Sequence, residues 1–379
     1  MDRIPVFRPF FDKREIEAVA STIDSRWIGL GPRTSEFESK FASYLGSKEA
    51  VGVSSCTEAI QLALMVSGIG SGCEVIVPSM TFAATSHAVL HNGATPVLVD
   101  CDPETFCIEI DSIESSINDR TKAIIPVHYG GHPCHMEKII EISKRYDLVI
   151  IEDVAHSLGA SISGQKVGTF GDFGAFSFQA TKSMTTGEGG MLSTNNTEAA
   201  AKLRSLRWFG IDKDTHARSK EEYSWYYEIT DIGLKANMND ITASIGLVQL
   251  EKLESINSMK KNIAESYNLG LDKIPQVRIP VERKWADRVY WNYVIYCKNR
   301  NQLSSFLSDN GISTSVHYMP VHLQPVYKKL IEKGSIPFKE LPNTEDVWDN
   351  ILSIPMYPEL ENSQIEYIIS KIVEFYKQL

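Results

Sequence analysis

The stretch around Lys182 has the residue types needed to form an imine with a carbonyl compound. This lysine follows a short apolar segment, has threonine and serine as its direct neighbours, and precedes a glycine-rich turn at residues 185–190. Residues 148–153 have the apolar pattern of a buried strand and end on the carboxylate of Asp153. A lysine for the aldehyde and a carboxylate for the ring nitrogen are the two groups that pyridoxal phosphate (PLP) requires. A lone lysine is usually a solvated surface charge, so this prediction depends on the surrounding residues.

A phosphate group would find suitable donors at residues 54–59, Ser-Ser-Cys-Thr-Glu-Ala, where a predicted strand passes into a predicted helix. Backbone N–H groups at the start of a helix bind phosphate together with nearby hydroxyls. The simpler interpretation of the same residues is an ordinary helix cap. Ser177 and Thr181 would add hydroxyls close to the lysine. Phe82 follows the next predicted strand and is placed either to stack on an aromatic ring or to pack in the core.

The sequence supports none of three other kinds of ligand site. Asp153 would also suit the magnesium ligand of a nucleotide-triphosphate enzyme, but the chain contains no G-x-x-x-x-G-K-[ST] loop. Residues 68–72 carry alternate glycines, yet they follow a predicted helix rather than a strand, which argues against a dinucleotide-binding turn. The histidines of residues 128–135 match no zinc-binding spacing. We therefore predict no metal site.

Composition sets the broad class of protein. The formal net charge is −10 over 379 residues and no lysine- or arginine-rich block is present, so a nucleic-acid partner is not expected. The six cysteines are scattered, which is typical of reduced cytosolic thiols. No apolar run has the length of a membrane span, and the first residues do not resemble a secretory signal. The expectation is a soluble cytoplasmic protein with no membrane partner.

Short β-branched segments alternate with helical patterns in the first part of the chain. This alternation predicts an α/β fold with a mostly parallel sheet that helices cover on both faces. Ligands in such sheets bind at the carboxyl ends of the strands, where Ser55, Asp153 and Gln179 are expected. The strands are predicted at residues 51–54, 73–78, 95–100, 123–127 and 148–152, and the helices at 57–66, 83–90 and 136–146.

The second part of the chain has a different pattern. Residues 208–237 are polar and aromatic and predict a long irregular excursion, after which a helix starts near Asn239 or Asp240. A strand at 293–296 opens a smaller C-terminal domain. Its last helix is predicted to start with a capping box formed by Ser363 and Glu366, with a buried face of Ile365, Ile368, Ile369 and Ile372. The predicted domains are residues 1–250, with an N-terminal arm and a large PLP-binding domain, and 251–379, with a connecting helix and a small α/β domain.

Several motifs, in the same order along nearly the whole chain, resemble the sugar aminotransferases of the DegT/DnrJ/EryC1/StrS family, which have the fold-type-I PLP architecture. Each motif alone is short, but their number and order make the resemblance specific. The motifs lie at residues 27–33, 55–59, 78–82, 152–156, 176–178, 182, 185–190, 238–241, 317–322 and 353–358.

Position by position, the resemblance implies Lys182 as the Schiff-base lysine and Asp153 as the partner of the pyridinium nitrogen. It implies that His156 lies beside the phenolic oxygen of the ring and that Phe82 stacks on the ring. An ionised Asp153 would keep the ring protonated and therefore an electron sink. Lys182, once released, would carry a proton between the donor Cα and the cofactor C4′.

The resemblance also implies which residues hold the phosphate. These are Thr57, Glu58 through its backbone, and Ser177. In relatives a residue matching Lys235 reaches the phosphate from the neighbouring subunit, so a homodimer with shared active sites is expected. Leucine and alanine flank this lysine where aromatic residues are usual, which leaves that contact open.

The activity implied is transfer of an amino group from L-glutamate to a nucleotide-linked keto sugar, with Gln179, His317 and His322 facing the sugar or nucleotide. A related branch of dehydratases carries histidine instead of Lys182, which argues against that chemistry. The resemblance also implies C4 of a 4-keto-6-deoxy sugar as the position aminated, because the sequence Thr-Thr-Gly-Glu-Gly-Gly, here at 185–190, is more frequent in the C4-aminating members of the family. The alternatives are amination of a 3-keto sugar, another fold-type-I PLP enzyme such as a lyase, and a non-enzymatic PLP-binding regulator.

Overall fold

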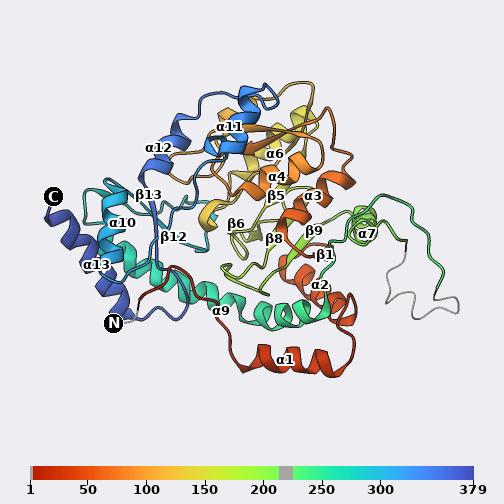
Figure 1. Cartoon of the computed structure of the whole chain (residues 1–379), viewed down its shortest axis with the longest axis horizontal. Coiled ribbons are helices and arrows are strands. Elements are labelled where there is room, and N and C mark those ends of the chain that lie inside the picture. Colours follow the sequence, from red (N-terminus) through yellow and green to blue (C-terminus); the bar gives the residue numbers. More distant parts are fainter. Residues whose placement is uncertain (1–2, 213–224) are drawn as a thin grey trace.

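The computed structural model describes residues 3–212 and 225–379, and a seven-stranded sheet forms its centre (Figure 1). The strand order is β1-β9-β8-β5-β4-β2-β3. From β8 to β3 all neighbours are parallel, whereas β9 is antiparallel to both β1 and β8. The predicted mostly parallel sheet is therefore confirmed. The strands are β1 (Glu49–Val53), β2 (Glu74–Pro78), β3 (Thr95–Val99), β4 (Thr121–Ile124), β5 (Val149–Asp153), β8 (Phe173–Ser177) and β9 (Gly190–Thr194).

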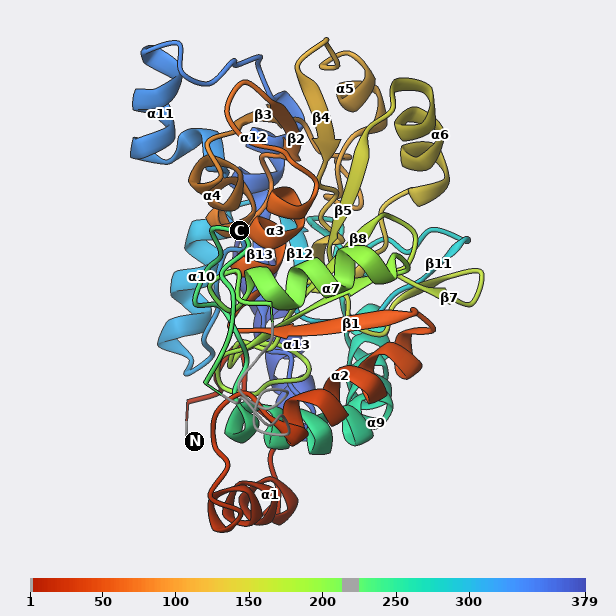
Figure 2. The same ribbon diagram turned by 90° about the vertical axis from the view of Figure 1, so that its right-hand side faces the viewer.

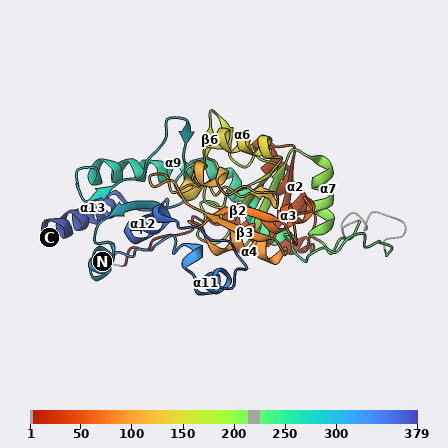
Figure 3. The ribbon, with the colours of Figure 1, turned by 90° about the horizontal axis from the view of Figure 1, so that it is seen from above.

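Helices cover both faces of this sheet, as the view from above shows (Figure 3). Alternate residues of a strand point to opposite faces, and the two cores follow that alternation. Val77 and Ile151 pack in the core that contains α3 (Cys56–Val66) and α7 (Thr197–Leu206). Ile76, Ile124 and Ile150 pack in the core that contains α6 (Met136–Tyr146).

An aromatic core joins the sheet to α2 (Pro32–Leu45). Phe41 of α2 packs edge-on against Phe176 of β8, with ring centroids 5.0 Å apart, and Phe178 lies 5.6 Å from it. Burying several phenylalanines removes a large apolar area from water, which stabilises this contact strongly. The segment that leads to Lys182 is thereby anchored on its apolar side.

The long helix α9 (Asp240–Leu271) connects this sheet to a second, smaller one (Figure 2). It begins as predicted, because the Asn239 side chain accepts a hydrogen bond from the Thr242 N–H at 2.9 Å. Leu247 packs in the aromatic core, whereas Tyr267 packs in a separate core with the second sheet. That sheet consists of β10 (Val277–Arg278), β12 (Tyr293–Cys297) and β13 (Ile351–Ile354), and it is covered by α10 (Arg300–Asp309) and α13 (Asn362–Lys377).

The predicted division at residues 250 and 251 falls inside α9, which packs in the aromatic core through Leu247 and in the core of the second sheet through Tyr267. Ile4, near the N-terminus, also packs in the core of the second sheet. It pairs with Ile312 in an isolated parallel bridge. We propose that the two units meet along α9 and that the N-terminal segment crosses from one to the other.

The start of the final helix differs from the prediction. Its N-cap is Glu361, whose backbone N–H donates to the Gln364 side chain at 3.1 Å, so the box of Ser363 and Glu366 does not form. Glu361 and Gln364 have the same spacing as Ser363 and Glu366 but lie two residues earlier, and they form the capping box of the first turn. The apolar face is confirmed, since Ile365, Ile368 and Ile372 are buried and Ile369 is half-buried against the same core.

Residues 208–212 and 225–237 extend beyond the sheet beside α7 as an irregular segment (Figure 1). They are held by isolated bridges such as Trp208 with Lys235, which agrees with the predicted excursion. Its residues 213–224 lie outside the described part of the chain. No helix in the described ranges has the length and apolar character needed to cross a membrane. The remaining elements are α1 (Lys13–Asp24), α4 (Ala83–His91), α5 (Ile110–Glu114), η1 (Tyr129–Gly131), β6 (Ser161–Ile162), β7 (Gln165–Lys166), β11 (Ala286–Asp287), η2 (Val321–Leu323), α11 (Pro325–Glu332) and α12 (Pro342–Asn350).

Candidate active site

A cavity of about 670 Å³ opens at the carboxyl ends of the central strands. It is bordered by the β1–α3 junction, the ends of β5 and β8, and segments next to β12 and η2 of the smaller unit. This is the position at which open α/β sheets bind ligands. Most of the predicted site residues line it together: Thr57, Phe82, Asp153, His156, Ser177, Gln179, Lys182 and His317.

Lys182 lies in a turn just after β8, and its backbone N–H donates to the Gln179 carbonyl at 2.9 Å. Its Nζ lies 4.1 Å from the ring centroid of Trp291. Burial lowers the pKa of the Lys182 amine to about 8, and the negative charge of Asp153 opposes this shift. A lysine with a depressed pKa retains a neutral, nucleophilic fraction near pH 7, as imine chemistry requires.

Asp153 is the last residue of β5 and is buried. One carboxylate oxygen accepts a hydrogen bond from the Thr85 hydroxyl at 2.8 Å, and the other accepts from the Ala155 N–H at 3.1 Å. Burial raises the pKa of Asp153, while these two hydrogen bonds and the positive charge of Lys182 oppose the rise. A buried carboxylate of this kind is stabilised most by a cation placed beside it.

His156 contacts two aromatic residues of the smaller unit. Its ring stacks on Trp291 with centroids 3.9 Å apart and planes 8° apart, and its Nε2 is 3.1 Å from the Tyr318 hydroxyl. Its Nδ1 is buried and has no hydrogen-bond partner among the described residues. Native structures rarely leave a buried polar atom unpaired, so this nitrogen marks a place for a polar ligand atom.

The β1–α3 junction forms the start of a helix, with Ser55 as its N-cap. The Ser55 hydroxyl accepts a hydrogen bond from the Glu58 N–H at 3.2 Å, and the Glu58 carboxylate is hydrogen-bonded to Ser54 and Ser55. The Glu58 N–H is therefore already used within the cap, whereas Thr57 faces the cavity. A side chain at Gly190 would come within 2.4 Å of the Ser55 backbone, so glycine is needed where β9 meets this junction.

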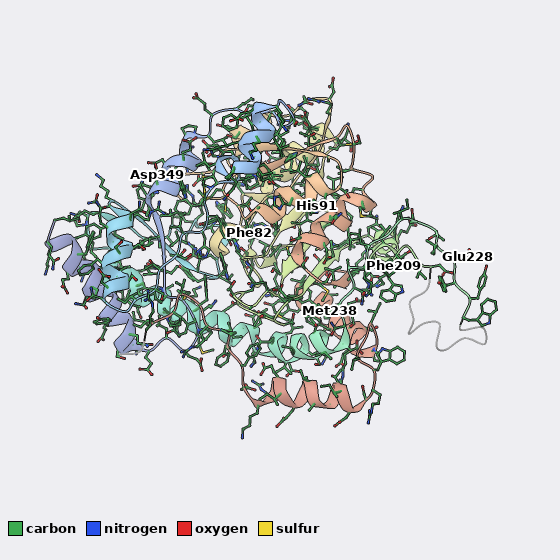
Figure 4. The ribbon with its side chains drawn as sticks, in the orientation of Figure 1. Phe82, His91, Phe209, Glu228, Met238 and Asp349 are labelled. Atoms are coloured by element: carbon green, nitrogen blue, oxygen red, sulfur yellow. The ribbon has the colours of Figure 1, made fainter. Side chains whose placement is uncertain are left out.

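Phe82, labelled in Figure 4, is exposed and lines the cavity. Its ring lies 5.4 Å from that of Tyr318. An exposed aromatic face at a cavity is available to stack on a flat ligand ring. The alternative of simple core packing is not supported by this exposure.

Two predicted residues lie away from the cavity. His322 is buried, with its Nδ1 2.7 Å from the Ser79 hydroxyl and its Nε2 3.3 Å from Glu345. Lys235 lies with its Nζ 4.1 Å from the ring centroid of Trp208. Its predicted contact is to a second subunit, which a single chain does not contain.

The histidine-rich segment 128–135 has structural contacts instead. His128 is buried with its Nε2 3.0 Å from Glu152, and His132 is hydrogen-bonded to backbone atoms of Pro133 and Arg283. Within the described ranges, no group of three or more histidine, cysteine or acidic side chains is arranged to hold a metal ion.

Several residues next to the site were missed by the sequence reasoning. Trp291 and Tyr318 line the cavity beside His156, and Thr85 holds Asp153. Lys260 of α9 is buried close to Lys182, and its Nζ donates to the Ser183 hydroxyl at 3.2 Å and to the Trp291 carbonyl at 3.3 Å. Tyr318 lies inside the motif at 317–322 and was within reach of the sequence analysis. Trp291, Thr85 and Lys260 contact the site residues only through tertiary packing.

Comparison with known proteins decides the family. Residues 9–373 match the model of the DegT/DnrJ/EryC1/StrS aminotransferase family. The chain belongs to this family. Its members are sugar aminotransferases that use PLP. The resemblance inferred from the sequence motifs and the predicted cofactor are therefore confirmed.

Individual relatives of this family member cover almost its whole length. The chain is 42% identical to an uncharacterized protein, MJ1066, of Methanocaldococcus jannaschii, covering 97% of this chain and 96% of that protein. It is 36% identical to the spore coat polysaccharide biosynthesis protein SpsC of Bacillus subtilis, covering 99% and 97%. The solved structure of the aminotransferase TlmJ from Streptoalloteichus hindustanus superposes with a TM-score of 0.92, at 32% identity and 99% coverage of both chains.

Proposed function

We propose that this aminotransferase moves an amino group from L-glutamate to a nucleotide-linked keto sugar, with Lys182 as the residue that binds the cofactor covalently. The observation that supports it most is the gathering of Lys182, Asp153 and the unpaired Nδ1 of His156 around one cavity. An amine, a carboxylate and a polar nitrogen are what the aldehyde, ring nitrogen and phenolic oxygen of PLP require. The residues of this chain therefore fit the cofactor of the family.

In the proposed arrangement, Asp153 lies against the ring nitrogen and Phe82 against the ring face. Thr57, the Glu58 backbone and Ser177 hold the phosphate, although the Glu58 N–H would have to give up its bond to Ser55. The bound cofactor supplies an electron sink for the bond broken at the donor Cα.

Lys182 carries the proton in the proposed reaction, taking it from the donor Cα and delivering it to C4′ of the cofactor. A pKa of about 8 leaves roughly a tenth of the free amine neutral at pH 7, available as a base. The ring of Trp291, on which His156 stacks, covers one side of the Lys182 amine and limits its contact with water. The same lysine can return the proton because its pKa lies close to the working pH.

We propose that the sugar lies between Gln179 and His317 and that the turn 185–190 favours a 4-keto over a 3-keto substrate. His317 has its Nδ1 2.8 Å from the Ser353 hydroxyl, which fixes the ring at the cavity wall. His322 is buried in η2 outside the lining, and it would contact the sugar only if η2 moved. The polysaccharide role in the name of SpsC is consistent with an amino-sugar product.

We propose a homodimer, because the described lining contains no cation besides Lys182 that would pair with the phosphate of the cofactor. Lys235 of a second copy would supply one. Large apolar side chains on and around α1 and on the excursion are exposed in the single chain, among them Ile16, Trp225 and Ile232, and a partner would cover them. The cytoplasm is the proposed location, since each of the six cysteines is a free thiol.

The test of the proposed function uses purified enzyme with PLP and two steps. Incubation with glutamate should convert bound PLP to pyridoxamine phosphate and release 2-oxoglutarate. The product enzyme is then offered a panel of nucleotide-linked 3-keto and 4-keto sugars, and the aminated sugar is identified by mass spectrometry and NMR.

Lys182→Ala is the matched control, expected to bind PLP without a covalent link and to form no pyridoxamine phosphate. Amination of a 4-keto sugar supports the whole proposal, and amination of a 3-keto sugar overturns the regiochemistry alone. Failure of the wild type to complete the glutamate step would refute glutamate as donor, and full activity of Lys182→Ala would refute the role of the lysine.

A further inference from the structure

The two ring nitrogens of His156 have different surroundings. Nε2 is 3.1 Å from the Tyr318 hydroxyl, whereas Nδ1 is buried without a partner in the described part of the chain. A neutral imidazole carries one proton, so one nitrogen donates and the other accepts. The partner at one nitrogen therefore fixes what the other can offer to a ligand.

Tyr318 is suited to be the donor of that hydrogen bond. Burial and the charge of Asp153 raise the pKa of its phenol, so the hydroxyl keeps its proton. Within the described residues, its hydroxyl has no other hydrogen-bond partner than Nε2. A buried hydroxyl directs its proton to the one acceptor in reach, which leaves the imidazole proton on Nδ1.

His156 remains a neutral, fixed ring under these conditions. Burial and the nearby positive charge of Lys182 lower its pKa well below the ordinary value, so the doubly protonated form is disfavoured. Stacking on Trp291 at 3.9 Å and the edge of Tyr129 at 6.0 Å hold the ring plane. The only freedom left to His156 is the choice of tautomer.

We propose that Tyr318 is a positioning residue that holds His156 in the tautomer with the proton on Nδ1, so that His156 donates a hydrogen bond to the phenolic oxygen of the cofactor. The inference rests on the proposed placement of that oxygen beside His156. Tyr318 lies between α10 and η2, in the smaller unit, whereas His156 follows β5 of the central sheet. The smaller unit would thus set the electronic state of a cofactor that the larger unit binds.

Two measurements on the holoenzyme test the inference, with Tyr318→Phe as the variant. The first is ¹⁵N NMR of histidine-labelled enzyme, in which protonated and unprotonated imidazole nitrogens have well-separated shifts and His156→Gln identifies the signals. The second is the pH titration of the visible band of the bound cofactor. Tyr129→Phe is the control, because it removes a hydroxyl beside the same ring that has no hydrogen-bond partner in the described structure.

The wild type should show a protonated Nδ1 and an unprotonated Nε2. Tyr318→Phe should move the proton wholly or partly to Nε2, and the midpoint of the spectral titration should rise by roughly one unit, a tenfold change in the dissociation constant, because the phenolate loses its donor. Tyr129→Phe should change neither the protonated nitrogen of His156 nor the midpoint of the spectral titration.

A wild type protonated on Nε2, or a Tyr318→Phe variant with unchanged ¹⁵N shifts, would overturn the role of Tyr318. A tautomer change without any spectral shift would overturn the contact between Nδ1 and the cofactor. Neither readout depends on the donor or the sugar, so failure of the substrate panel would leave this result standing.

Discussion

Replacing Lys260 by methionine offers a quantitative test of the electrostatics around the reactive lysine. Burial and the charge of Lys182 lower the pKa of the Lys260 amine to about 7 from an ordinary 10.5. It has hydrogen bonds to the Ser183 hydroxyl and the Trp291 carbonyl, and no ion pair involving it is found among the described residues. Burial without an ion pair disfavours the charged form of this amine, so the folded protein is more stable when Lys260 is neutral.

The magnitude follows from proton linkage. Between pH 7 and 10.5 the unfolded chain binds the Lys260 proton and the folded protein does not, so the free energy of unfolding rises with pH through this window. With these two pKa values, the cost of burying Lys260 falls by about 2–3 kcal/mol between pH 6 and pH 9. Lys260→Met removes this pH-dependent cost. It also removes both hydrogen bonds, and leaving the Trp291 carbonyl unpaired costs about 1–3 kcal/mol at every pH.

The assay is denaturant unfolding of both proteins at pH 6, 7, 8 and 9, with the difference in the free energy of unfolding plotted against pH. Contributions from all other titrating groups cancel to first order in that difference. We expect the wild type to gain about 2–3 kcal/mol relative to Lys260→Met from pH 6 to pH 9. A difference that is flat with pH, or that changes in the opposite direction, would refute the neutral state of Lys260 in the folded protein.

Two further predictions concern the site. Asp153→Asn should lower the rate of the glutamate step by roughly 10²–10³-fold or more. The same variant should change the free energy of unfolding by only about 1 kcal/mol, since the amide can still accept the hydrogen bond from Thr85. If the variant loses the cofactor or the fold to the same extent as the rate, the proposed electronic role of Asp153 is contradicted. His317→Gln should raise KM for the sugar several-fold, whereas His322→Gln should leave KM unchanged and cost about 1 kcal/mol of stability for the lost contact with Ser79. Steady-state kinetics measure the effect of each variant on KM, and thermal unfolding measures its effect on stability. Equal effects of the two variants on KM would contradict the inference that His317 faces the sugar and His322 does not.

The parts of the molecule that the sequence predicts are those encoded in local patterns. Continuous apolar segments such as residues 148–153 are typical of strands buried on both faces, and the Asn239 cap marks the start of α9 without tertiary information. The cavity residues that follow a strand end, Asp153 and Lys182 among them, are predictable because parallel strands bring their carboxyl ends to one edge of the sheet.

The missed features depend on contacts between distant segments. Trp291 carries no local signal of its contact with His156, because that contact exists only once the smaller unit packs against the sheet. The start of α13 differs from the prediction because Ser363 with Glu366 and Glu361 with Gln364 both fit a capping box at the same spacing, and the box of Glu361 and Gln364 is the one that forms. The unpaired Nδ1 of His156 is a property of three-dimensional surroundings and has no counterpart in the sequence.

Because α9 packs in two hydrophobic cores, it couples the unfolding of one core to that of the other. A helix of 32 residues is roughly 48 Å long, and its two halves cannot melt separately without losing hydrogen bonds at the junction. Lys260 lies in the second half, where the packing of α9 meets the backbone beside the reactive amine. Thermal denaturation should therefore be a single cooperative event, and the catalytic pocket should disappear in the same transition as the fold.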